Sequence, residues 1–187
     1  MKKFAIIVLL LITITIMCSF LNFLFGGSIS PRRKVINKIM EKITLDFKRK
    51  YDLHFVGFDV AAPDGTYNSI GPLFHYRHDL NKDQGRVLLL NCVEDLLIIF
   101  NNTPEFKKYM TNSVFTNKNV EVTIFVRSPE LGDVYYPDIA VFSFFNNTLW
   151  YDSNSLEKKN GYYTEEKETY EEAKQIIEKQ QSKVVGN

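Results

Sequence analysis

The longest apolar stretch of the chain lies at its N-terminus. Residues 4–25 form a 22-residue run without charge, whose polar side chains are Thr13, Thr15, Ser19 and Asn22. A helix of this length spans about 33 Å, enough for a hydrocarbon core of about 30 Å. The run follows Lys2 and Lys3, the short basic start that is typical of an export signal. We therefore expect residues 1–28 to be a signal sequence or a transmembrane anchor, with residues 4–25 in the membrane.

Three fates are open for this segment. Its length favours an uncleaved transmembrane helix, because the apolar region of a cleaved signal peptide is normally about 7–15 residues long. The small residues of Gly26-Gly27-Ser28 allow cleavage after Ser28. Lipidation of Cys18 is the third alternative, although Met17 and Thr15 stand where a bacterial lipobox has a small residue and Leu.

The charges that flank the run bear on its orientation. Lys2 and Lys3 favour a cytoplasmic N-terminus, whereas Arg32, Arg33 and Lys34 just past the run favour the reverse. The order of basic, apolar and small residues is that of an export signal. We therefore expect the domain to lie outside the cytoplasm, either anchored to the cell membrane or, after cleavage, periplasmic or secreted.

Directly after the apolar run, the chain has a segment with the residue spacing of an amphipathic helix. Between residues 31 and 50, apolar side chains recur at three- and four-residue steps, at Ile36, Ile39, Met40, Ile43 and Phe47. The opposite face is rich in Lys and Arg and carries only Glu41 and Asp46 as acids. We expect 29–52 to form a juxtamembrane basic amphipathic helix. Its basic face is either simply solvated or held near anionic lipid headgroups.

The middle of the chain predicts a hairpin and two helices. Extended patterns at 53–61 and 71–79 flank the turn signal Pro63-Asp64-Gly65. A broad apolar face at 81–102 predicts the central core helix, capped by Asn81 or Asp83. A short helix to about Met110 follows, with Thr103 as its expected cap.

The C-terminal third predicts three strands and a closing helix. Residues 119–127 alternate between apolar and polar, and 138–145 and 148–152 flank Asn146-Asn147, a pair suited to a tight turn. Thr164 is expected to cap a helix to about Gln181. The whole order predicts one α+β domain over 53–182, with a mainly antiparallel sheet of about five strands packed by about four helices. A disordered tail is expected at 183–187.

Charge and cysteine content narrow the function classes. The chain has 23 basic and 22 acidic residues, and loss of Lys2 and Lys3 with residues 1–28 leaves 21 against 22, a net charge of −1. A near-neutral body argues against nucleic acid as a partner. The two cysteines do not make a disulfide framework, and Cys92 falls among apolar helical residues, as a small hydrophobic side chain does.

His75 and His78 lie in the densest polar segment, His75-Tyr76-Arg77-His78-Asp79. On one strand their odd separation would point them to opposite faces, so we expect no metal site there. His54 can approach His75 across the predicted hairpin. These three histidines are weak catalytic candidates, and the sequence carries no motif that indicates a cofactor.

Aromatic residues surround the last hairpin. Its candidate binding residues are Tyr135, Tyr136, Trp150 and Tyr151. One face of the hairpin can enter the core, and the other is either covered by a helix or exposed as an interaction patch. With four helices available for one sheet, helix cover is the favoured expectation.

The segments 115–122 and 168–173 resemble small, uncharacterised exported bacterial proteins that have no assigned activity. This resemblance implies bacterial export and transfers no site residues. With the membrane-addressing run, it favours a non-enzymatic binding or interaction module of the cell envelope, with a ligand or protein partner still to be identified. The alternatives are a small envelope hydrolase that uses the His54, His75 and His78 region, and a secreted effector.

Overall fold

A computed structural model describes residues 29–128, 132–155 and 161–185. The chain divides into two compact units, Met1–Lys34 and Val35–Asn187. The predicted membrane run at 4–25, Cys18 and the cleavage point after Ser28 lie outside the described residues. Among the helices that are described, none is both long and apolar enough to cross a membrane.

The described elements make one mixed sheet and four helices. In chain order they are α2 (Pro31–Tyr51), β1 (His54–Ala61), β2 (Ser69–Tyr76), α3 (Lys82–Asn101), α4 (Pro104–Lys107), β3 (Val122–Ser128), β4 (Gly132–Asp133), β5 (Val141–Phe145), β6 (Thr148–Asn154), β7 (Tyr162–Thr169) and α5 (Tyr170–Val185). The strand order is β1-β2-β3-β5-β6-β7, and the short β4 pairs with β3. This arrangement confirms the α+β class.

Among the described strands, every named pair but one is antiparallel. The β1–β2 and β5–β6 hairpins form where expected, and Asn146 and Asn147 take the positive φ values of 48° and 62° that their tight turn needs. β2 and β3 are parallel, because α3 carries the chain back along the sheet between them. Register shifts interrupt the β1–β2 pairing between Phe55 and Gly57, and the β6–β7 pairing between Tyr151 and Asp152.

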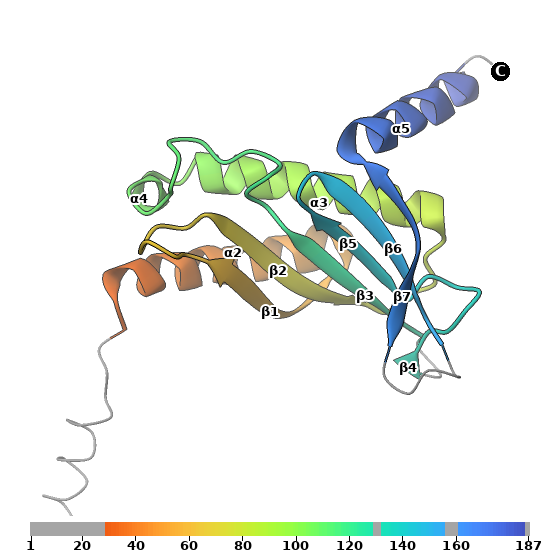
Figure 1. The fold of residues 1–187 in the computed structure, drawn as a ribbon, viewed down its shortest axis with the longest axis horizontal. Helices are drawn as coiled ribbons and strands as arrows, with labels where there is room; N and C mark the ends of the chain where they lie inside the picture. The colour runs from red at the N-terminus through yellow and green to blue at the C-terminus, as the bar shows by residue number, and fades with distance from the viewer. Residues whose placement is uncertain (1–28, 129–131, 156–160, 186–187) are drawn as a thin grey trace, which may run out of the picture. The chain divides into compact units, whose positions relative to one another are not determined.

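Helices α2 and α3 lie on one face of the sheet, as Figure 1 shows. The apolar stripe expected on α2 is fully engaged, since its five members are buried in the core. Phe47 of α2 stacks on Phe74 of β2 with 5.4 Å between ring centroids. α2 is thus part of the folded core as well as the helix that follows the apolar run.

The N-terminus of α3 has the capping expected from the sequence. The side chain of Asn81 accepts a hydrogen bond from the backbone of Gln84, and the Gln84 side chain accepts one from the backbone of Asn81. Thr103 occupies the N-cap position of α4 with Pro104 in the first turn, as expected, but the Thr103 side chain makes no capping hydrogen bond. Its hydroxyl donates instead to the Ile99 carbonyl at the end of α3, 2.7 Å away.

The prediction of a helix from Thr164 is wrong, because residues 162–169 form β7, which pairs with β6. Helix α5 begins only after Thr169. The Thr169 hydroxyl accepts from the Glu172 backbone, and the Glu172 carboxylate accepts from the Thr169 backbone 2.8 Å away. This is a capping box of the Thr-x-x-Glu type. At the other end, α5 continues to Val185, into the segment that was expected to be a disordered tail.

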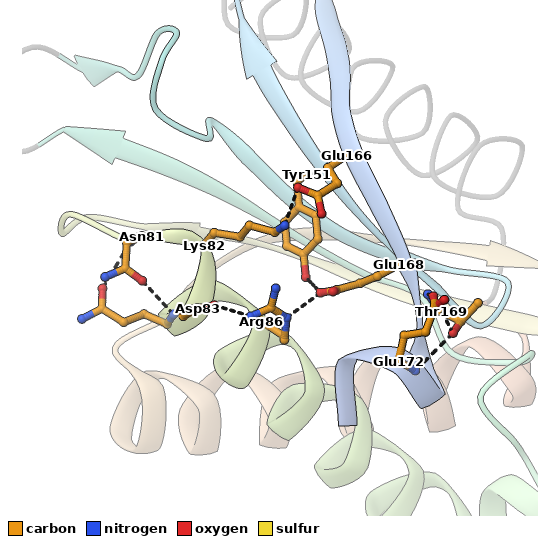
Figure 2. Close-up of polar contacts among 10 residues, drawn as sticks. Asn81, Lys82, Asp83, Arg86, Tyr151, Glu166, Glu168, Thr169 and Glu172 are labelled. Atoms are coloured by element: carbon orange, nitrogen blue, oxygen red, sulfur yellow. Dashed lines mark hydrogen bonds and ion pairs between the residues drawn. The ribbon is translucent and has the colours of Figure 1, made fainter. Parts of the chain in front are cut away.

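Strand β7 is fastened to α3 by a buried polar network, shown in Figure 2. Arg86 of α3 is 3% exposed and its Nε donates to Glu168 Oε1 on β7, 2.6 Å away. The Tyr151 hydroxyl on β6 donates to the same carboxylate oxygen, and Asp83 accepts from Arg86. Burial works against the charge of Arg86, but the bonds to Glu168 and Asp83 outweigh it and hold its pKa above the ordinary value.

Next to this network, α3 lies unusually close to β5. A Cβ atom built on Gly85 would come within 2.0 Å of the Phe142 ring. Only glycine allows the helix backbone this close to a fully buried aromatic side chain. Gly85 therefore sets the distance between the first turns of α3 and the sheet.

We predict that Gly85→Ala lowers the free energy of unfolding by about 1–3 kcal/mol, because the added methyl overpacks against Phe142. In an exposed helix the same change would stabilise by about 1 kcal/mol, so the sign of the effect is diagnostic. Urea unfolding followed by the fluorescence of Trp150, the single tryptophan, measures it. Gly57→Ala is the control, since a Cβ there meets nothing within 4 Å.

We predict that Glu168→Gln lowers the free energy of unfolding by about 3–5 kcal/mol, because it removes one partner of a buried ion pair. Glu166→Gln on the same strand is the matched control. The Glu166 side chain, which pairs with Lys82, is 57% exposed, so its loss should cost less than about 1 kcal/mol. Equal effects in the same urea titration would show that the buried pair does not fasten β7.

Candidate functional site

Two of the three candidate histidines face each other across the β1–β2 hairpin. His54 at the start of β1 is directly opposite His75 of β2, as the sequence predicted. The expectation that His75 and His78 occupy opposite faces of one strand is wrong, since β2 ends at Tyr76 and His78 lies beyond it. There the chain leaves the sheet and brings His78 to the C-terminal end of α2.

Asp52 joins His78 to α2. It follows the last residue of the helix with a φ of 56°, in the left-handed region that often ends helices. Its carboxylate accepts from His78 Nε2 at 2.6 Å and from the ammonium of Lys48. Lys48 Nζ also lies 2.8 Å from His54 Nε2. An ammonium can only donate, so His54 Nε2 accepts and His54 is neutral.

The electrostatics of this cluster follow from its surroundings. Hydrogen bonds from Lys48 and His78 lower the pKa of Asp52 to about 2. Partial burial lowers the pKa of His54 and of His75 below the usual 6.5, and neighbouring cations lower both further. These cations are Lys48 and Arg77 for His54, and Arg127 and Arg77 for His75. The cluster is therefore built to keep two imidazoles uncharged beside fixed positive charge.

Asp52 also lines an open cleft of about 670 Å³ between α2 and α3. We call it the α2–α3 cleft, and its walls come from the end of α2, the β2–α3 connection, the first half of α3, and α5. Its lining residues are Arg49, Lys50, Tyr51, Asp52, Tyr76, Asp79, Leu80, Asp83, Gln84, Val87, Leu88, Asn91 and Gln180. The lining thus combines apolar and aromatic side chains with charged and amide groups.

A polar contact between the helices bounds the cleft. Asp95 of α3 accepts from Lys50 Nζ at 2.7 Å and from the Tyr51 hydroxyl at 2.9 Å. Burial, outweighing the opposing hydrogen bond to Lys50, raises the pKa of Tyr51 to about 12. Tyr51 therefore stays protonated and keeps donating at neutral pH. A second cleft of about 390 Å³ lies on the other side of this contact and includes Ile98.

The chemistry available around the α2–α3 cleft is limited. Its lining residues include no Ser, Thr or Cys to act as a nucleophile. Within the part of the chain that the structure describes, no three His, Cys, Asp or Glu side chains are placed to hold a metal ion. Cys92 is fully buried in α3, and burial raises the pKa of its thiol well above the ordinary value.

The four aromatic candidates separate in space. Tyr151 is fully buried and belongs to the Arg86–Glu168 network, so it offers no surface for a ligand. Trp150 points to the opposite face of the sheet, where Lys167 lies over its ring at 5.2 Å. Tyr136 is 63% exposed, and Tyr135 is half-buried beside it. The structure does not bring these four residues into one site.

The expectation of helix cover for the second face of the last hairpin is wrong. The described helices α2 and α3 both occupy the other face of the sheet (Figure 1), and Phe145 is 54% exposed. The two long helices both cover the face of the sheet that carries the buried Phe74, Phe142 and Phe144. This leaves the Trp150 face without a described helix across it.

Sequence reasoning missed Lys48, Asp52 and the cleft. The only local signal was the two-residue connection between a Lys-rich helix end and a strand that begins with His54. Such a short connection holds the last turn of the helix close to the strand end. The convergence of His78 depends on where β2 stops, which the alternating pattern does not define.

We predict that acidification destabilises the fold through His54 and His75. Both histidines have a lower pKa in the folded chain than in the unfolded chain, so the unfolded chain binds more protons at acidic pH. The free energy of unfolding should therefore be at its full value above about pH 6.5 and should fall as the pH drops below it. His75→Gln removes one imidazole. The slope of the free energy of unfolding against pH should then decrease by the contribution of at most about one proton. Urea unfolding between about pH 8 and pH 5 tests this. The plots of unfolding free energy against pH should be parallel for parent and variant above pH 7. Equal slopes of the two plots below pH 7 would contradict the prediction.

Comparisons with known proteins do not assign this chain to a family. Neither a protein-family model, nor a curated protein, nor a solved structure matches the chain. The predicted resemblance to exported bacterial proteins stays a prediction, and the residues of the cluster and the cleft carry the functional argument by themselves.

Proposed function

We propose that this chain is a non-enzymatic binding module of the bacterial cell envelope, which captures a ligand or protein segment in the α2–α3 cleft. The observation that carries the proposal is the cleft itself. It combines apolar and aromatic side chains, such as Tyr76 and Leu88, with amide and charged groups such as Asn91 and Asp79. Such a mixture provides contact area together with groups that orient a bound partner.

Binding is favoured over catalysis because the reactive parts are missing from the cleft lining. His78 and Asp52 form a carboxylate–imidazole pair, but the pair is exposed and the cleft offers it no hydroxyl or thiol nucleophile from Ser, Thr or Cys. An imidazole so placed can donate a hydrogen bond. It does not by itself make a hydrolase.

The envelope location rests on the sequence. The apolar run at 4–25 is long enough to stay as an anchor, and the basic, apolar and small residues are in the order of an export signal. The proposal therefore places the domain outside the cytoplasm, anchored or released by cleavage. The hydrolase alternative keeps one specific observation in its favour, the 2.6 Å bond between His78 and Asp52.

A photo-crosslinking amino acid at position 88 tests the cleft in the full chain. Leu88 lies in the cleft wall and is half-buried, so the probe should capture a discrete partner in cells that export the protein. The same probe at Val114, which is 54% exposed away from the cleft, is the matched control. Asn91→Trp, which narrows the cleft, should lower capture by about tenfold, equivalent to about 1.4 kcal/mol.

Two outcomes would contradict the proposal. Equal capture at positions 88 and 114 would mean that the cleft is not selective. Turnover of an ester, peptide or glycoside substrate that disappears in His78→Ala, with the fold intact by circular dichroism, would support the hydrolase alternative. Retained capture in His78→Ala with no turnover by the parent chain supports binding.

A further inference from the structure

The outer side of helix α2 carries a stripe of exposed cations around one exposed leucine. The stripe consists of Lys38, Lys42, Leu45 and Arg49, at steps of four, three and four residues. Residues at these steps share one face of a helix. Leu45 is 72% exposed, the highest value among the large hydrophobic side chains described as exposed. We call this surface the basic outer stripe.

Acidic residues only partly offset the stripe. Arg49 bonds to Asp46 at 3.1 Å, but the Arg49 side chain remains 83% exposed. Glu41 is exposed near the stripe. Among the described residues, neither Lys38 nor Lys42 has a carboxylate within ion-pair distance. The stripe therefore presents a positive surface with an apolar side chain in its middle.

The buried side of α2 limits how this helix can meet a membrane. A surface-lying amphipathic helix usually places its apolar face in the lipid. Here that face is taken by the protein core, with Ile36, Ile43 and Phe47 no more than 1% exposed. Any contact of α2 with a bilayer must therefore use its exposed side, on which the basic outer stripe holds the exposed leucine.

In the sequence, the start of this stripe follows closely after the predicted membrane run. If residues 4–25 span the bilayer, only residues 26–30 separate the run from the start of α2 at Pro31. Five extended residues reach at most about 18 Å. Anionic headgroups attract cations over a Debye length of about 8–10 Å, so the first turns of α2 can reach this field.

From these observations we infer that the basic outer stripe docks on the anionic lipid headgroups of the membrane that holds residues 4–25. The inference rests on the membrane attachment in the proposed function and does not need a ligand in the cleft, although Arg49 of the stripe also lines the cleft. Lys38, Lys42 and Arg49 contact lipid phosphates, and Leu45 leaves water for the interfacial region. Each cation near the surface strengthens the contact by about fivefold.

A fluorescent probe at position 45 tests this docking in the full chain. In a Cys18→Ser background, Leu45→Cys is the labelling site, because Cys92 is fully buried. An environment-sensitive dye is attached, and the protein is reconstituted in vesicles of phosphatidylcholine, with or without phosphatidylglycerol. We expect a blue shift and a loss of iodide quenching only with phosphatidylglycerol, and a return to the unshifted spectrum at high salt.

Two variants serve as controls. Phe145→Cys carries the same dye on the opposite face of the sheet, and its spectrum should be the same in both vesicles. Lys38→Glu with Lys42→Glu should abolish the shift at position 45, while the protein still floats with the vesicles. Both substituted side chains are exposed, so the fold should be retained, which circular dichroism checks.

The outcomes separate this inference from the attachment on which it rests. Flotation with an unshifted dye at position 45 overturns the docking alone. A shift that is the same with neutral lipid, or that survives the double charge reversal, also overturns it, because docking on anionic headgroups requires both the lipid charge and the two lysines. A chain that does not float overturns the membrane attachment, and the docking with it.

Discussion

The buried pair of Arg86 and Glu168 is the interaction on which the arrangement of this domain depends. An unpaired charge in the core would cost several kcal/mol, so the two side chains hold each other in place. Arg86 belongs to α3 and Glu168 to β7, the last strand of the sheet. The pair therefore fixes the central helix against the C-terminal edge, and Gly85 beside it sets how closely helix and sheet approach.

This constraint reaches the candidate site through α3. Arg86 and Gly85 hold the first turns of α3. Further along the same helix, Asp95 binds Lys50 and Tyr51 at the end of α2. The α2–α3 cleft lies between these two attachments. Its shape is thus set by buried contacts on either side, although the residues that line it are themselves partly exposed.

Local patterns predicted the parts of this structure that depend on local physics. The stripe from Ile36 to Phe47, the Asn81 cap and the Asn146-Asn147 turn are each specified by a few neighbouring residues. β7 was missed because its acidic residues are typical of the first turn of a helix, and only the pairing with β6, which no local pattern shows, makes this segment a strand. The correct helix start was present in the sequence as Thr169 and Glu172, three residues apart. The contact of His78 with Asp52 joins residues 26 positions apart and could not be read from any local pattern.

The two register shifts in the sheet also affect how one molecule meets another. β1 and β7 are the edge strands, and an edge with a regular row of free backbone groups can pair with the same edge of a second molecule. The bulge at Phe55–Gly57 twists the β1 edge, and the shift between Tyr151 and Asp152 disturbs the ladder that supports β7. Irregular edges let two molecules collide without extending one another's sheets into an aggregate.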